Sequence, residues 1–488
     1  MKRNTPLLTM MVLILALPAL AEQAKKVKLP ESRGGWRVAA YFQAFNSGDE
    51  MELAKFWAEN ATREALGQRP VAERVRFTKM LINDLKRLEP KQVLLADKGQ
   101  IIVLVQAQTG AWLEFSFQFE PGPAQRIVSL GVGQSEAPPE GGWATPQTEA
   151  DFLGILDAYL AEETQKGEFS GVVLLARKGQ VLYRKAYGLA SLEYRVANMV
   201  DTKFNLGSIN KLFTKVAIGQ LAEQGKLSIS DTIGKYIPDY PNRQAAEQVT
   251  IRQLLEMSSG IGDFFGAKFQ DLPKDKLRNI ADYLPLFAAE PLAFAPGSKQ
   301  LYSNGAYVVL GIIIEKIAGQ SYYDYVRERI FTPAGMPNTE SFQADMPTAN
   351  LASGYTREWD GREHAKEPRR NNLYTRPARG SSAGGGYSTV DDLLAFTIAI
   401  TDNWLLQPGY SRWVLGGAEP GPNDLKGGPA LGRGGLSVGG GAPGINASLE
   451  MDFGRGYTWI VLSNFDPPTA MKVGRRMRQW LASVKPPK

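Results

Sequence analysis

The 488-residue chain contains no cysteine and one histidine, His364. Disulfides, thiol nucleophiles and thiolate metal sites are therefore excluded. One histidine is also too few for the usual zinc ligand sets, and we expect neither a metal nor a cofactor. His364 stands in the charged segment Arg362-Glu363-His364-Ala365-Lys366, where a solvated surface position is expected. Nucleophilic catalysis that depends on histidine is thus nearly excluded by composition.

A large excess of one charge is absent as well. The 56 Lys and Arg residues and 50 Asp and Glu residues give a formal net charge of +6. Loss of Lys2 and Arg3 with a leader would leave 6 − 2 = +4. So small a charge does not predict nucleic-acid binding.

The first 21 residues have the pattern of an export signal. Lys2 and Arg3 form a basic start, residues 7–20 are apolar, and Ala19-Leu20-Ala21 offers a small-residue cleavage pattern. The apolar run is shorter than the roughly 20 residues needed to span a membrane. We expect residues 1–21 to be a cleaved signal peptide and the protein to be periplasmic or secreted from a bacterium, without a stable membrane anchor. An uncleaved anchor is the alternative.

The segment 33–133 has the pattern of a small α+β domain. Helical spacing of apolar residues is followed by alternating, strand-like runs. The helices are expected at 37–46, 52–60 and 71–88, and the strands at 92–96, 101–107, 112–119 and 126–131. The order resembles the cone-shaped, nuclear-transport-factor-two-like domains. The segment shows no catalytic cluster, so we expect an accessory role, with homodimerisation as one option.

A linker rich in proline and glycine at 134–148 separates this segment from a second region at 149–484. Strand patterns occur near both ends of the second region, with helical patterns between them. The strands are expected at 171–176, 180–187, 447–453 and 457–464, and the helices at 149–163, 208–224, 250–257, 306–318 and 321–330. This arrangement predicts an α+β domain with an antiparallel sheet closed by its two ends, flanked by helices, and a helical subdomain.

Ser208 and Lys211 form the one Ser-x-x-Lys sequence of the chain. Residues at i and i+3 share a helix face, with Cβ atoms roughly 5–6 Å apart. The lysine amine can therefore reach the serine hydroxyl and take its proton, which activates a serine without histidine. The backbone N–H of a serine at a helix start can also contribute to an oxyanion hole.

Tyr302 and Asn304 form a second candidate pair. A tyrosine near a lysine can have its phenol pKa lowered and act as a general base, and an asparagine two residues later can bind the amine and a substrate carbonyl. Tyr240 and Asn242 match the same Tyr-x-Asn pattern. We favour Tyr302 because a long apolar helix follows it directly, whereas Tyr240 stands in a proline-containing loop.

The third element is the run Ser437-Val438-Gly439-Gly440-Gly441-Ala442-Pro443-Gly444. Glycines let a backbone pass close to a substrate and direct an N–H at it. A bulged strand and turn with no catalytic role would have the same composition.

These three elements, in this order, resemble the motifs of the serine β-lactamase and penicillin-binding-protein superfamily, in particular its class C β-lactamase-like branch with family VIII carboxylesterases and D-peptidases. The resemblance covers roughly residues 150–484. It implies that Ser208 is the acylated nucleophile, that Lys211 and Tyr302 share the role of base and that Asn304 positions the substrate. It also implies that Val438, Gly439 and Gly440 border the substrate, and that the N–H groups of Ser208 and Gly441 form the oxyanion hole.

Two positions depart from the family pattern. Val438 stands where this branch usually has lysine or histidine, and Met257 stands where a histidine is usual. The loss of a cation at Val438 removes a partner for a substrate carboxylate, which counts against strong β-lactamase or carboxypeptidase activity.

We therefore expect an exported serine hydrolase that acts on a small ester, amide or peptide through an acyl-enzyme. Penicillin binding with weak β-lactamase activity is the second option. A degenerate member that binds cell-wall peptides or a protein partner without turnover is the third.

Overall fold

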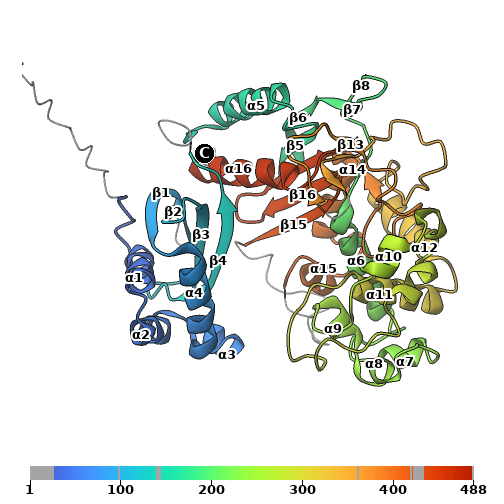
Figure 1. Cartoon of the computed structure of the whole chain (residues 1–488), viewed down its shortest axis with the longest axis horizontal. Helices are drawn as coiled ribbons and strands as arrows, with labels where there is room; N and C mark the ends of the chain where they lie inside the picture. Colours follow the sequence, from blue (N-terminus) through green and yellow to red (C-terminus); the bar gives the residue numbers. More distant parts are fainter. Residues whose placement is uncertain are drawn as a thin grey trace, which may run out of the picture. The chain divides into compact units, whose positions relative to one another are not determined.

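The computed structural model describes residues 27–96, 99–138, 144–359, 362–417, 420 and 434–485 (Figure 1). The expected signal peptide at 1–21 lies outside the described residues. The chain divides into two compact units, Met1–Trp143 and Ala144–Lys488. Within the described residues, none of the helices has both the length and the apolar character that crossing a membrane requires.

The N-terminal unit consists of helices followed by an antiparallel meander. The helices are α1 (Arg33–Ser47), α2 (Glu50–Asn60), α3 (Arg63–Gln68) and α4 (Val71–Leu85). The strands β1 (Leu88–Ala96), β2 (Gln100–Ala107), β3 (Trp112–Phe119) and β4 (Ile127–Ser135) pair in chain order. Several bounds differ from the sequence prediction: α1 and β1 each begin four residues earlier than expected, and β4 ends four residues later. Lys86 has φ +66° and ends the third predicted helix three residues early, and the short α3, capped by Thr62, was not predicted.

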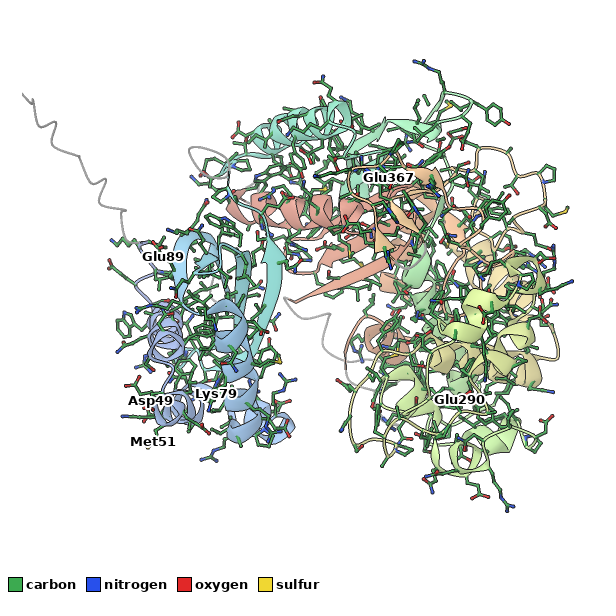
Figure 2. All side chains as sticks on the ribbon, viewed as in Figure 1. Asp49, Met51, Lys79, Glu89, Glu290 and Glu367 are labelled. Carbon is green, nitrogen blue, oxygen red and sulfur yellow. The ribbon has the colours of Figure 1, made fainter. Side chains whose placement is uncertain are left out.

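Aromatic side chains fill the core of this unit. The buried ring of Tyr41 makes edge or tilted contacts with rings from both helices and strands, namely Phe42, Phe45, Phe56, Trp57, Phe115 and Phe117. At the surface, Asp49 caps α2 by accepting from the backbone N–H of Met51, and Lys79 of α4 pairs with Glu50 at 2.6 Å (Figure 2). The unit therefore has a hydrophobic core of its own.

The second unit is built on a five-stranded antiparallel sheet of order β15-β16-β17-β5-β6. The strands are β5 (Gly171–Arg177), β6 (Gln180–Tyr187), β15 (Gly435–Ala442), β16 (Ile445–Asp452) and β17 (Tyr457–Ser463). The two ends of the domain thus meet in one sheet, as the sequence predicts. Residues 437–442 of the glycine run lie in strand β15, which pairs with β16 without a bulge, and residues 443 and 444 form the turn between the two strands.

Alternating residues of the central strands face two different helical layers. On one face, Val173, Leu175 and Trp459 pack against α5 (Glu149–Gln165) and α16 (Thr469–Ser483), which lie side by side in Figure 1. On the other face, Val172, Leu174 and Ile460 pack against the larger core that includes α6 (Lys211–Glu223), α11 (Asn304–Ala318) and α14 (Val390–Thr401). Period-two alternation in β5 and β17 thus gives the sheet two buried faces.

Shorter elements complete the second unit. The helical segments are η1 (Gly207–Asn210), α7 (Ile233–Tyr236), α8 (Arg243–Gln248), α9 (Ile251–Leu255), α10 (Ala267–Asp271), η2 (Lys274–Lys276), η3 (Ile280–Leu286), α12 (Tyr322–Val326), η4 (Arg327–Phe331), α13 (Thr332–Ala334) and α15 (Pro408–Val414). The short strands pair as β7 (Leu189–Ser191) with β8 (Val196–Ala197), β9 (Phe204–Asn205) with β14 (Tyr387–Ser388), β10 (Tyr355–Thr356) with β13 (Arg370–Asn371), and β11 (Glu358–Trp359) with β12 (Arg362–Glu363).

His364 is less solvated than its charged neighbours suggested. Its ring stacks on Trp359 with 4.1 Å between the centroids, and its side chain is 21% exposed. Its Nδ1 lies 3.2 Å from Glu367 Oε1. The hairpin of β11 and β12 brings the Trp359 ring over the imidazole, and this contact shields one face of the His364 ring from solvent.

Candidate active site

Ser208 lies in a tight turn between a strand and a helix. The strand β9 ends at Asn205, whose Oδ1 accepts a hydrogen bond from the Gly207 N–H at 2.9 Å. Gly207 has φ +50°, a left-handed conformation that glycine adopts without strain. The 3-10 turn η1 then carries Ser208 into the first turn of the buried helix α6. The predicted placement of Ser208 at a helix start is what the structure shows.

The side chains of Lys211 and Tyr302 contact the Ser208 hydroxyl, and Asn304 contacts Lys211. Ser208 Oγ lies 2.6 Å from Tyr302 Oη and 3.1 Å from Lys211 Nζ. Lys211 Nζ also lies 2.7 Å from Asn304 Oδ1 and 4.8 Å from the centroid of the Tyr302 ring. Residues more than 90 positions apart in the sequence are thereby joined in one hydrogen-bonded cluster.

Lys211 is the basic group of this cluster. The residue is 8% exposed, and burial lowers the pKa of its amine to about 7, while the negative charge of Asp263 acts in the opposite direction. Besides Ser208 and Asn304, its Nζ donates to the backbone oxygen of Ala383 at 2.5 Å. A neutral amine can donate to Asn304 and Ala383 and still direct its lone pair at the Ser208 hydroxyl. This geometry suits a general base at neutral pH.

The phenol of Tyr302 behaves differently from the sequence-based expectation. We expected a lowered pKa, but burial raises the pKa of this hydroxyl, Asp263 adds to the rise, and the hydrogen bond from Ser208 offsets only part of it. Tyr302 is 53% exposed, yet its hydroxyl end is held against Ser208. The Lys211 amine, with a pKa of about 7, is neutral at the pH where a phenol titrates and therefore does not lower the pKa of Tyr302. At neutral pH the phenol therefore keeps its proton and acts as a donor.

Asn304 is fixed by a carboxylate that the sequence analysis missed. Asp263 Oδ2 accepts from the Asn304 backbone N at 3.0 Å and from Asn304 Nδ2 at 2.8 Å. Because an ionised carboxylate only accepts hydrogen bonds, the amide nitrogen must face Asp263 and the amide oxygen must face Lys211. Ser303 caps α11 by accepting from the Ala306 N–H at 2.9 Å, which holds Tyr302 directly before the helix.

Strand β15 runs against the Ser208 turn with no room for side chains. A Cβ on Gly440 would lie 1.9 Å from the Leu206 oxygen and 2.9 Å from the Ser208 nitrogen. A Cβ on Gly207 would lie 2.7 Å from the Gly441 nitrogen. The backbone nitrogens of Ser208 and Gly441 therefore belong to two tightly apposed segments.

Val438 and Gly439, earlier in the glycine run, contact residues outside the Ser208 cluster. Val438 pairs with Leu449 across the sheet and packs against the large core. A Cβ on Gly439 would meet the Met471 sulfur at 3.0 Å. Of the run, Gly441, Ala442 and Pro443 line the cavity beside Ser208, whereas Val438, Gly439 and Gly440 are not among the described residues that do.

The other Tyr-x-Asn pair lies in a separate part of the helical region. Tyr240 is buried, and Asn242 caps α8 by accepting from the Ala245 N–H at 3.0 Å. Asn242 Nδ2 donates to the Glu290 oxygen at 2.8 Å. Tyr240 thus packs in the core, and Asn242 stabilises the start of α8. Because these roles are structural, we favour Tyr302 and Asn304 as the catalytic pair.

A cavity of about 100 Å³ opens beside Ser208. Ser208, Asn304 and Gly441 lie at one side of it. Aromatic residues form much of its wall, namely Phe264, Phe265, Tyr283, Phe342 and Tyr387. A small organic molecule that entered the cavity would therefore be held between apolar rings and the reactive hydroxyl.

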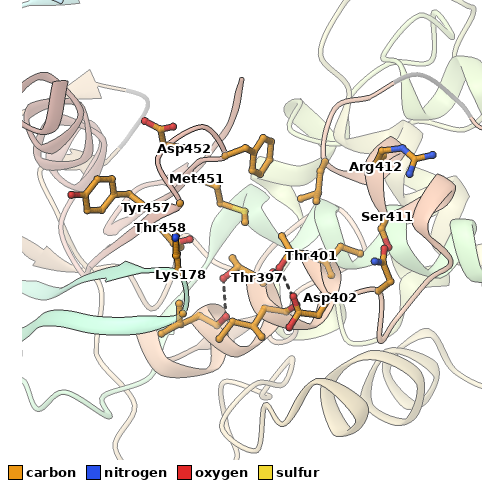
Figure 3. Close-up of a pocket in the computed structure, with 18 of the residues that line it drawn as sticks. Lys178, Thr397, Thr401, Asp402, Ser411, Arg412, Met451, Asp452, Tyr457 and Thr458 are labelled. Atoms are coloured by element: carbon orange, nitrogen blue, oxygen red, sulfur yellow. Dashed lines mark hydrogen bonds between the residues drawn. The ribbon is translucent and has the colours of Figure 1, made fainter. Parts of the chain in front are cut away.

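A larger hollow of about 790 Å³ lies elsewhere in the second unit (Figure 3). It is bordered by α14, α15 and the turns at Lys178 and Gly456. Thr397 and Thr401 use their hydroxyls on backbone oxygens of α14. Ser208, Lys211 and Tyr302 are absent from its described lining, and no described group of three or more acidic or histidine residues in the chain could hold a metal. The cavity beside Ser208, and not this larger hollow, is therefore the candidate substrate site.

Comparison with known proteins identifies the family of the chain. A family model described as Beta-lactamase matches residues 156–483, more than half of the chain. Penicillin-binding protein 4* of Bacillus subtilis (strain 168) is 35% identical over 180 residues, which cover 36% of this chain and 39% of that protein. Protein flp of Staphylococcus aureus (strain MW2) is 30% identical over 203 residues, 41% of this chain and 40% of that protein. The chain thus spans about two fifths of the length of these curated relatives.

Solved structures share the fold of the second unit. The crystal structure of a penicillin binding protein from Bacillus halodurans has a TM-score of 0.57 and 28% identity, and covers 66% of this chain and 98% of its own. D-amino acid amidase from Ochrobactrum anthropi SV3, complexed with L-phenylalanine amide, has a TM-score of 0.55 and 23% identity, with 68% and 98% coverage. At 23% identity, the similarity to the amidase shows a shared fold and nothing further.

Proposed function

The chain belongs to the beta-lactamase family, and on this premise we propose that it is a serine hydrolase that forms an acyl-enzyme on Ser208. Its substrates are small esters, amides or peptides. The observation that carries the proposal is the position of Ser208 Oγ between Lys211 Nζ at 3.1 Å and Tyr302 Oη at 2.6 Å. A nucleophile in contact with both a base and a proton donor is the arrangement that acyl transfer needs.

Acylation begins with attack of Ser208 Oγ on the substrate carbonyl carbon, while the hydroxyl proton moves to the neutral Lys211 amine. The new ammonium is stabilised by the oxygens of Asn304 and Ala383, which already accept from Nζ. The carbonyl oxygen becomes an oxyanion, which the N–H groups of Ser208 and Gly441 would stabilise.

Collapse of the tetrahedral intermediate breaks the bond to the leaving alcohol or amine, which takes a proton from Tyr302 as Lys211 returns one to the phenol. Water then attacks the Ser208 ester and gives a proton to the neutral Lys211 amine. Lys211 returns this proton to Ser208 Oγ as the acid product leaves, which restores the hydroxyl. No group beyond water, substrate and these side chains is needed to balance the two steps.

The edge position of β15 supports peptides and amides as substrates. Among the described strands, β15 pairs with β16 alone, so its other side can pair with an extended substrate backbone. The glycines at 439–441 place no side chain in the way. Such pairing would lay a scissile carbonyl near the Gly441 N–H.

Two further candidates rest on specific observations. The relatives named penicillin-binding proteins support acylation of Ser208 by β-lactam antibiotics with slow release. Val438, in place of the usual cation, supports a degenerate protein that binds cell-wall peptides without turnover. Hydrolysis of 4-nitrophenyl butyrate that is lost in Ser208→Ala would exclude the degenerate protein. A chromogenic cephalosporin measured beside the ester separates the first candidate from an esterase.

We also propose that the protein is exported after cleavage at Ala21 and that the N-terminal unit has an accessory role, for example in homodimerisation. The basic and apolar pattern of residues 1–21 supports export, and the bacterial origin of the relatives is compatible with it. N-terminal sequencing of protein secreted by a bacterial host, and light scattering of the purified chain, test these two points.

A further inference from the structure

Arg376 is the one charged residue among the described residues that line the Ser208 cavity. Its Nη1 donates to Tyr387 Oη at 2.9 Å. No carboxylate in the described part of the chain pairs with its guanidinium. A guanidinium has five N–H donors in a planar fork that matches a carboxylate, so the bond to Tyr387 leaves most of them available.

Arg379, in the same loop, has a structural role and serves as a comparison for Arg376. Arg379 donates from Nε to the Ser341 oxygen at 2.9 Å and lies 3.6 Å from a carboxylate oxygen of Glu340. Its guanidinium also lies 3.5 Å above the centre of the Tyr323 ring. Arg379 thus has a backbone oxygen, a carboxylate and an aromatic ring as partners, whereas the partly buried Arg376, three residues earlier, donates to the Tyr387 hydroxyl at a cavity wall.

The loop that carries Arg376 is anchored on both sides of it. The Thr375 N–H donates to the Asn372 oxygen at 3.0 Å, and the Ala378 N–H donates to the Lys274 oxygen at 2.9 Å. The side chain is therefore held at the cavity before any ligand arrives. Preorganisation of this kind reduces the entropy lost on binding.

The rest of the cavity wall favours an apolar group near this cation. The rings of Phe264 and Phe265 are tilted by 43° to each other, with 4.4 Å between their centroids. The ring centroid of Phe342 lies 6.2 Å from that of Tyr387, the hydrogen-bond partner of Arg376. A flat or branched apolar group fits between such rings, and a carboxylate attached to it would meet the guanidinium.

We propose that Arg376 is an anion-binding residue of the Ser208 site and that the substrate carries a carboxylate next to an apolar group. The proposal rests on the proposed hydrolase function and narrows its substrate class. The cation comes from the 372–379 loop instead of from strand β15, where the partly buried Val438 packs against the large core. The absence of lysine at position 438 would then redirect the site toward a different placement of the carboxylate and would not remove anionic substrates.

Binding to Ser208→Ala tests the proposal without any need for turnover. Phenylacetate and phenylacetamide have the same ring, and only the first carries a charge. Calorimetry should show that phenylacetate binds about tenfold to a hundredfold more tightly than phenylacetamide, as expected for a charged hydrogen-bonded pair. Arg376→Gln in the same background should abolish the difference, and Arg376→Lys should restore part of it.

Arg370→Gln is the matched control, because it removes the same charge from a side chain that lies over the Trp359 ring outside the cavity wall. It should leave the preference intact. Equal affinities for the two compounds, no binding of either, or equal weakening of both by Arg376→Gln would overturn the proposal. A separate assay with 4-nitrophenyl butyrate on the wild-type protein reports whether the hydrolase function itself fails.

Discussion

The carboxylate of Asp263 accepts two hydrogen bonds from Asn304, at 3.0 Å from the backbone N and 2.8 Å from Nδ2. The same carboxylate acts on the charge state of the whole site, because it raises the pKa values of both Lys211 and Tyr302. Asp263 is therefore a positioning residue that links the orientation of Asn304 to the basicity of Lys211.

Asp263→Asn should move the acid limb of the kcat/KM profile to lower pH. Removal of the negative charge leaves burial as the main influence on Lys211, so the pKa of its amine falls further below its present value of about 7. A pH series with 4-nitrophenyl butyrate measures the shift. Glu290→Gln, which removes an exposed carboxylate paired with Lys268 at 2.6 Å, is the control and should leave the limb in place (Figure 2). An acid limb of the Asp263→Asn profile that keeps its position or moves to higher pH would count against this role.

Lys211 should control the pH dependence of the wild-type enzyme. Its neutral amine is the active form, so kcat/KM should rise with pH through about 7 and flatten above it. Lys211→Ala should lower kcat by roughly 10²- to 10⁴-fold, the range of general acid–base catalysis. His364→Ala should change kcat little, because His364 stacks on Trp359 away from the cluster. Comparable losses in the two variants would refute the Ser-Lys assignment.

Tyr302→Phe tests the phenol as proton donor to the leaving group. Removal of the hydroxyl that lies 2.6 Å from Ser208 Oγ should slow turnover by about 10²-fold. Tyr307→Phe is a suitable comparison, since its ring also faces Lys211, with Nζ at 5.5 Å from the centroid, and its hydroxyl is 3.4 Å from the Leu255 oxygen. Steady-state kinetics on esters with good and poor leaving groups should show the larger loss for the poor ones. A uniform loss would assign Tyr302 to binding instead.

Gly440→Ala and Gly439→Ala form a matched pair on strand β15. The new methyl at 440 would lie 1.9 Å from the Leu206 oxygen, so the strand or the Ser208 turn must move. We expect a loss of about 1–3 kcal/mol of stability, typical of overpacking, together with most of the activity. At 439 the nearest atom is the flexible Met471 sulfur at 3.0 Å, so thermal unfolding and activity should change less. The reverse order would contradict the close packing of β15 against Ser208.

The sequence predicted the elements whose signals are local. The helical patterns of α6 and α11 and the apolar strand runs of β5 and β17 all have counterparts in the structure. One predicted helix, at 321–330, divides instead into α12 and a single π turn, η4. Helix ends depend on individual backbone angles, as at Lys86, which periodicity does not report.

The site could be predicted only as far as its motifs extend. Ser208, Lys211, Tyr302 and Asn304 each belong to a short recognisable pattern. Asp263 and Arg376 stand in loops without one, and their roles arise from contacts across 41 and 11 positions. The direction of the Tyr302 pKa shift also depends on burial, which is a property of the folded surroundings.

Labelling with a fluorophosphonate probe, followed by mass mapping of the modified peptide, tests the central claim most directly. We expect one adduct, on Ser208, that forms faster as the pH rises through about 7 and is absent in Ser208→Ala. A folded wild-type protein that remains unmodified, or one that is modified at another residue, would show that Ser208 is not the activated nucleophile.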